Sequence, residues 1–214
     1  GDLPANPSRG IDLAREPERL PRTVPTEREM RRFLRMARTT NVLELRDRAV
    51  LEVLYSSGIR RKEAVGLDLA DVDFDDGVLT VRQGKGGRDR VVPIGRVAAG
   101  HLERYLRRGR PLLAKVGADP GRVFLSATGR PLDGRAVGYL VQRAVRKTGF
   151  KCHLTPHVFR HAFATHMIRN RANVRHVQER LGHAKLETTE RYLHLTILDL
   201  KDAHRRFHPR ERER

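Results

Sequence analysis

The stretch LTPHVFRH occupies residues 154–161 and marks the start of a helix in the last third of the chain. Pro156 favours the first helical position, because its fixed φ suits a helix and its missing N–H is not needed there. His157 and Arg160 are three residues apart, so both side chains leave the first turn on the same side. The free backbone N–H groups of such a turn attract an anion. The stretch therefore predicts a helix start that can bind an anion, although an arginine considered alone is more often a surface charge.

Helical spacing of apolar residues continues on both sides of this stretch. Thr26 and Glu29 have the spacing of a capping box, so we expect a helix to begin at Thr26. Apolar residues recur at helical intervals elsewhere, and we predict further helices at 46–56, 61–67, 97–108, 134–147, 157–169, 173–181, 188–193 and 197–207.

Strand patterns are short. Apolar residues alternate over 78–81 and 91–94, on either side of a glycine-rich turn at 83–89, which predicts a β-hairpin with an exposed tip. Residues 72–74 and 123–125 are further short candidates. The expected fold class is therefore mainly α with a small antiparallel β-sheet (α+β).

Lys85 lies at the predicted hairpin tip, between Gly84 and Gly86. The turn lacks the spacing, and the following Ser or Thr, of a nucleotide-binding loop. Glycines on both sides let the backbone approach a phosphate chain closely, so a lysine presented in this way can reach into a groove. A solvated tip without a function is the alternative reading of the same residues.

The charge balance points to a polyanion as partner. The 214 residues contain 44 Lys and Arg against 26 Asp and Glu, which gives a formal net charge of +18. Such a surplus repels itself, and nucleic acid or an anionic membrane usually compensates it. Because the sequence contains neither a long apolar run nor a signal-peptide pattern, we expect nucleic acid and no membrane.

The ends of the chain differ in composition from the rest. Five prolines fall within residues 1–25, which we interpret as a linker or arm, while 26–209 form one domain and 210–214 a frayed tail. The chain begins with Gly1, which suggests a segment of a longer protein. Cys152 is the one cysteine, so no internal disulfide can form and the expected compartment is the cytoplasm.

Four histidines, at positions 153, 157, 161 and 166, could suggest a metal site. Histidines four apart share a helix face, as zinc ligands require, but no glutamate follows His157 and no carboxylate close by completes a ligand set. We therefore expect neither a metal nor another cofactor.

Taken together, five dispersed motifs resemble the catalytic domain of tyrosine recombinases, and within that family the Xer and integrase branch. They are residues 55–60 (YSSGIR) with Glu63 and Leu67, Lys85, residues 154–161, Leu181 to His183, and Tyr192. The resemblance runs from about Thr26 to Pro209, and the order and spacing of the motifs agree. Relatives usually carry a helical DNA-clamping domain ahead of this one, so the chain is expected to be a catalytic fragment or a natural minimal enzyme.

The resemblance implies a transesterification at a DNA phosphodiester. Tyr192 would be the nucleophile that forms a 3′-phosphotyrosyl link, and a 5′-hydroxyl would later reverse the attack and reseal the strand. Two guanidinium groups, from Arg60 and Arg160, would bind the non-bridging oxygens of the reacting phosphate. Because the covalent link stores the energy of the bond, no ATP or metal is needed.

The same resemblance implies roles for the remaining residues. Lys85 would protonate the departing 5′-oxygen, His157 would act as acid or base near the tyrosine, and His183 would hydrogen-bond the phosphate. Glu63 would orient the cationic cluster. Three further residues would contact DNA, namely Arg61, Lys62 and Arg88.

Two alternatives to a recombinase remain open at this point. One is a non-catalytic DNA-binding or regulatory domain with the same fold, and the other is a type IB topoisomerase-like activity. The resemblance further implies that protomers assemble on duplex DNA as a tetramer. Of the other tyrosines, Tyr55, Tyr105 and Tyr139 sit among apolar neighbours in the sequence and are expected in the core.

Overall fold

The computed structural model describes residues 24–82, 89–116, 119–170, 172–173, 176–177, 181, 204–206 and 208–211. Its elements are α1 (Glu27–Met36), α2 (Val42–Ser57), α3 (Arg61–Val65), η1 (Leu69–Asp71), β1 (Val72–Asp73), β2 (Val78–Val81), β3 (Arg90–Pro93), α4 (Arg96–Arg104), η2 (Tyr105–Gly109), α5 (Arg110–Ala114), α6 (Gly134–Thr148), α7 (Pro156–Arg169) and η4 (Pro209–Glu211). The prediction of a mainly helical fold with a small antiparallel sheet is confirmed.

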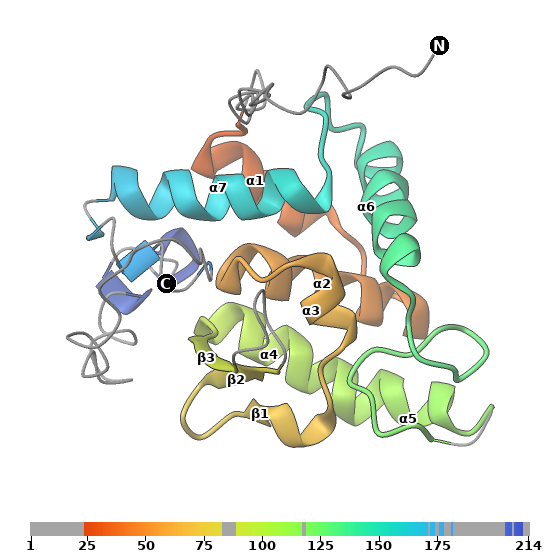
Figure 1. The fold of residues 1–214 in the computed structure, drawn as a ribbon. Coiled ribbons are helices and arrows are strands. Elements are labelled where there is room, and N and C mark those ends of the chain that lie inside the picture. Colours follow the sequence, from red (N-terminus) through yellow and green to blue (C-terminus); the bar gives the residue numbers. More distant parts are fainter. Residues whose placement is uncertain are drawn as a thin grey trace, which may run out of the picture.

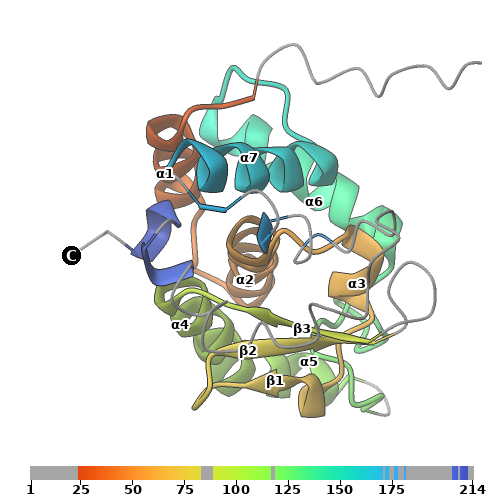
Figure 2. The same ribbon diagram turned by 60° about the vertical axis from the view of Figure 1, so that its left-hand side comes forward.

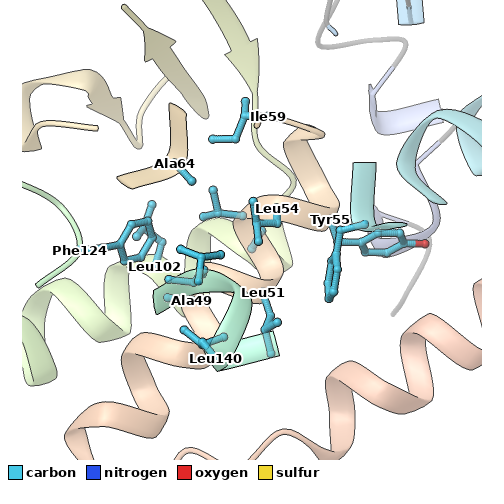
Figure 3. Close-up of a cluster of buried hydrophobic side chains, with 14 of the residues drawn as sticks. Ala49, Leu51, Leu54, Tyr55, Ile59, Ala64, Leu102, Phe124 and Leu140 are labelled. Carbon is cyan, nitrogen blue, oxygen red and sulfur yellow. The ribbon is translucent and has the colours of Figure 1, made fainter. Parts of the chain in front are cut away.

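Helix α2 lies at the centre of the molecule (Figures 1 and 2). Helices α1, α6 and α7 cover one side of it, and the sheet with α4 and α5 lies on the other. The core contains side chains from all of these elements, and Figure 3 shows a part of it around Ala49, Leu51, Leu54, Leu102, Phe124 and Leu140. Because the core surrounds α2, the residues at the end of α2 are held firmly in place.

The two ends of α2 are set by local chemistry. Asn41 caps the helix, since its side chain accepts a hydrogen bond of 2.9 Å from the backbone N–H of Glu44. The helix therefore begins at Val42, four residues before the predicted start. It ends at Gly58, whose φ is +66° and where any Cβ would overlap the ring of Phe163.

The sheet has the strand order β1-β2-β3, and both pairs are antiparallel. The predicted hairpin is confirmed, with Val81 opposite Arg90 at the end next to the turn and Val78 opposite Pro93 at the other end. The strand candidate at 123–125 is wrong, because only Leu125 forms a single bridge, to Pro131. Those three residues are fully buried, and the N–H of Leu125 binds the Tyr105 hydroxyl at 3.2 Å rather than a neighbouring strand.

The helix predicted at 97–108 is longer in the structure. Helix α4 continues through a π-helical turn, η2, into α5, which ends at Ala114. Pro111 lies in the first turn of α5. A proline there cannot donate a hydrogen bond and crowds the carbonyl one turn earlier, so a wider turn ahead of it relieves the conflict.

Both ends of the described chain pack more closely than the sequence suggested. Pro25 is buried and its carbonyl accepts a hydrogen bond of 2.9 Å from Nε2 of His166. Arg210 is 2% exposed, so the expectation that the chain frays from residue 210 is wrong at that residue. The predicted helices at 188–193 and, for the most part, 173–181 and 197–207 lie outside the described residues, as does the predicted arm up to residue 23.

Within the described ranges, every helix is too short or too polar to cross a lipid bilayer.

Candidate active site

Arg60 occupies the connection between α2 and α3. Its backbone is extended, and it forms the N-cap position of α3. The backbone N–H of Arg60 donates to Oε2 of Glu63 at 2.7 Å, and its Nη1 donates to Oε1 of the same carboxylate at 2.9 Å. The glutamate therefore caps the helix and holds the arginine side chain at once.

A second arginine binds the same carboxylate from the sheet. Arg90, the first residue of β3, donates from Nη1 to Oε1 of Glu63 at 3.0 Å and from Nη2 to Oε2 at 2.7 Å. Burial of Glu63 opposes its ionisation, but hydrogen bonds from Arg90 and Arg60 outweigh this and lower the pKa of Glu63 to about 2. The carboxylate is therefore charged at neutral pH. Figure 2 shows α3 beside the sheet.

Arg160 reaches the same connection from α7. Helix α7 begins at Pro156, as predicted, and Thr155 caps it by accepting a hydrogen bond of 3.2 Å from the N–H of Val158. Nη1 of Arg160 donates to the carbonyl of Gly58 at 2.9 Å, and Nη2 donates to the carbonyl of Leu181. The carbonyl of Gly58 lies beyond the end of α2, where helical partners are missing, so the guanidinium satisfies it.

The two predicted phosphate-binding arginines therefore meet at the α2–α3 connection, since Gly58 precedes Arg60 by two residues. The Arg60 side chain is 29% exposed. In the described part of the chain, its Nε and Nη2 form no hydrogen bond. These donors suit a planar oxyanion, which a guanidinium binds with two N–H groups.

The other predicted residues fall into two groups. His157 lies in the first turn of α7 and is exposed, three residues before Arg160, while Arg61 and Lys62 are exposed on α3. The positions of Lys85, Arg88, His183 and Tyr192 lie outside the described residues. The structure thus brings Arg60, Glu63 and Arg160 together and leaves the other assignments as predictions.

Sequence comparison agrees with this geometry. Residues 24–197 match the phage integrase family. The chain belongs to the phage integrase family.

Curated relatives of this integrase-family chain are tyrosine recombinases. XerC 2 of Ralstonia nicotianae is 42% identical over 209 residues, which are 98% of this chain and 60% of that protein. XerD of Mycobacterium tuberculosis is 46% identical over 170 residues, which are 79% of this chain and 54% of that protein. The chain thus spans less than two thirds of the length of these relatives.

Solved structures share the integrase-family fold. The crystal structure of XerA recombinase has a TM-score of 0.68 and 30% identity, and the match covers 92% of this chain and 68% of XerA. XerH site-specific recombinase bound to palindromic difH substrate, a post-cleavage complex, has a TM-score of 0.63 and 25% identity, with coverage of 86% and 53%.

Two of the described tyrosines of this integrase-family chain are unsuited to the role of nucleophile because they are buried. Tyr55 and Tyr105 are fully buried, as predicted. Burial raises the pKa of Tyr55, and its hydroxyl is 2.9 Å from Nδ1 of His166, so it stays protonated. Tyr139 was expected in the core, but it is 76% exposed on α6. That helix turns its apolar face, with Val137, Leu140 and Val141, to the core and Tyr139 to the solvent.

Arg90 is the site residue that sequence reasoning missed. The alternation of the strand held the signal, because Arg90 shares a face with Val92, which is fully buried, whereas Val91 is 38% exposed. An arginine on the inner face of a strand needs a carboxylate partner, which Glu63 provides.

Within the described ranges, no group of three or more His, Cys, Asp or Glu side chains is arranged to hold a metal ion. His166 instead hydrogen-bonds Tyr55 and Pro25 in the core.

Proposed function

We propose that the chain is the catalytic part of a site-specific DNA recombinase that cuts and rejoins duplex DNA through a 3′-phosphotyrosyl intermediate. Its membership of the phage integrase family and its Xer recombinase relatives support this proposal. The observation that carries it is the meeting of Arg60 and Arg160 at the α2–α3 connection. Two side chains 100 residues apart in sequence are thereby anchored at the same connection.

In the proposed reaction, the Tyr192 oxygen attacks the scissile phosphorus. A P–O bond to tyrosine forms, the P–O bond to the 5′-oxygen breaks, and the 5′-hydroxyl of another strand later reverses both changes. The guanidinium groups of Arg60 and Arg160 bind the non-bridging oxygens, where negative charge grows in the transition state. Their N–H groups are oriented in advance by Glu63 and by the carbonyl of Gly58.

Proton transfer completes the proposed step. His157 accepts the proton that Tyr192 loses, and Lys85 donates a proton to the departing 5′-oxygen. His183 hydrogen-bonds the phosphate. The exposed position of His157 in the first turn of α7 supports its part, because it leaves the imidazole accessible to DNA.

The proposed substrate is duplex DNA. The net charge of +18 and the exposed Arg61 and Lys62 beside Arg60 support it, and Arg88 is proposed as a further phosphate contact. XerH in the post-cleavage complex is bound to its DNA substrate, which supports the same partner here. We further propose that protomers assemble as a tetramer on the recombination site and act in the cytoplasm.

The test uses a nicked duplex built on a site that the chain selects from a random DNA library. The nick lets a short strand leave after cleavage, so the covalent intermediate accumulates. We expect a protein–DNA adduct that survives denaturation and that Tyr192→Phe abolishes, while binding falls steeply with salt.

Binding of the selected site without any adduct would contradict the proposal and favour a regulatory domain. Relaxation of supercoiled DNA without strand exchange between two sites would favour a topoisomerase instead.

A further inference from the structure

Two arginines share the carboxylate of Glu63. Each of its oxygens accepts one hydrogen bond from Arg60 and one from Arg90. Arg60 is a local partner, three residues away, whereas Arg90 comes from the sheet, 27 residues away. The Arg90 and Glu63 side chains are 15% and 7% exposed, and that of Arg60 is 29% exposed.

The bonding differs between the two arginines. Arg90 engages Glu63 with both Nη groups, which is the strongest arrangement for this pair. Arg60 engages it with Nη1 and the backbone N–H. If Arg90 were absent, the carboxylate would have two unfilled acceptor positions. The donors that still contact it belong to Arg60, so the Arg60 guanidinium would turn toward Glu63.

We propose that Arg90 is a positioning residue for the reaction. By occupying one side of the Glu63 carboxylate, it limits the hold of Glu63 on the Arg60 side chain to Nη1 and leaves Nε and Nη2 of Arg60 to the DNA phosphate. This inference rests on the proposed function, since it assumes that Arg60 binds the reacting phosphate.

The same hairpin supplies a matched control. Arg82 follows β2, and its Nε binds Oδ1 of the buried Asp71 at 2.6 Å. This pair also joins an arginine to a carboxylate of the neighbouring helical segment, η1, but none of its contacts involve Arg60. A variant at Arg82 therefore shows how the reaction responds when the hairpin loses an ion pair that does not involve Arg60.

The test compares Arg90→Met, Arg90→Lys and Arg82→Met on the nicked duplex described above. We expect Arg90→Met to slow adduct formation by about 10- to 100-fold, because misplacing a binding group by about 1 Å has effects of this size. Its Kd for the intact duplex should change by less than about threefold, since the surface charges that dominate DNA binding remain. Arg90→Lys should restore part of the rate, and Arg82→Met should match the wild type within about threefold.

A double variant shows whether the effect passes through Glu63. In the Glu63→Gln background, Arg90→Met should slow the reaction by less than about threefold further, because the shared carboxylate is already gone. An equal slowing in both backgrounds would overturn the proposal.

A second measurement needs no catalysis. The order of the Arg60 Nε–H group, from ¹⁵N relaxation on the free protein, should change in Arg90→Met and stay at the wild-type value in Arg82→Met. If the wild type forms no adduct, the recombinase proposal fails, and this measurement still decides whether Arg90 positions Arg60. Unchanged order in Arg90→Met would overturn the positioning role.

Discussion

Two glutamates of this protein are each held by two arginines, and they differ in what surrounds them. Glu52 on α2 is fully buried, and its partners Arg48 and Arg210 are 5% and 2% exposed. Arg48 donates from Nε to Oε1 at 3.0 Å, and Arg210 donates to Oε1 at 2.6 Å and to Oε2 at 3.2 Å. In the cluster around Glu63, by contrast, the Arg60 side chain is 29% exposed.

The difference separates a closed cluster, in which Glu52 and both of its arginines are buried, from an open one, in which Arg60 is partly exposed. The charges around Glu52 satisfy one another inside the protein, and they attach the segment that contains Arg210 to α2. The charges around Glu63 hold Arg60 by Nη1, and its Nε and Nη2 form no hydrogen bond with the described residues. The exposure of the arginine side chains, rather than the residue types, therefore decides whether a cluster can contact a ligand.

The largest expected effect comes from opening the closed cluster. Glu52→Gln should lower the free energy of unfolding by about 3–5 kcal/mol, because it leaves Arg48 and Arg210 buried without a counter-charge. Urea denaturation at pH 7, followed by circular dichroism, measures the loss. Adding Arg210→Met to Glu52→Gln should recover part of it, since one uncompensated charge is then removed. A loss below about 1 kcal/mol would mean that the cluster admits water.

The open cluster around Glu63 should respond in the opposite way, with a large effect on the reaction rate and a small effect on stability. Arg60→Ala should slow adduct formation by about 100- to 1000-fold, the usual effect of losing one donor to a developing oxyanion. Its free energy of unfolding should change by less than about 1 kcal/mol, because a partly exposed ion pair adds little to stability. Rapid-quench assays and urea denaturation give the two values. A large loss of stability would show that Arg60 is part of the core after all.

The closed cluster also predicts a dependence of stability on pH. Burial, followed by the charges of Arg48, Arg104 and Arg210, lowers the pKa of His101 to about 4. Nε2 of His101 lies 4.0 Å from Glu52, whose charge is already matched by arginines. Between pH 6.5 and 4 the unfolded chain binds a proton at His101 that the folded chain does not, so stability falls as the pH falls.

The expected loss from pH 7 to pH 4 is on the order of 2 kcal/mol from this group. Urea denaturation at several pH values measures it, and His101→Gln should flatten the slope. Part of the slope should remain, because burial also lowers the pKa of His166. A slope that His101→Gln leaves unchanged would contradict the assignment.

The sequence was sufficient for the parts of the fold that depend on local pattern. Apolar spacing predicted α1, α6 and α7, and alternation predicted the pairing of β2 with β3. Apolar spacing placed the start of α2 at residue 46, because the spacing carries no sign of the helix cap at Asn41.

Contacts between distant residues were not accessible in this way. Arg90 and Arg210 bind carboxylates that are 27 and 158 residues away, and local pattern carries no such information. Arg60, Glu63 and Arg160 were predicted because they resemble family motifs. Physical reasoning from the residues alone favoured a surface position for Arg160. Only the fold brings its guanidinium to Gly58.

The smallest expected effect comes from a solvent-exposed ion pair, which serves as a reference for the two glutamate clusters. Glu103 on α4 and Arg107 form an ion pair of 2.8 Å one helical turn apart, with side chains 43% and 77% exposed. Glu103→Gln should change the free energy of unfolding by less than about 0.5 kcal/mol, because solvent already screens the pair. The substitution is chemically the same as Glu52→Gln, so the same denaturation experiment isolates the effect of closure. If the two variants lost equal stability, burial would not explain how the glutamate clusters differ.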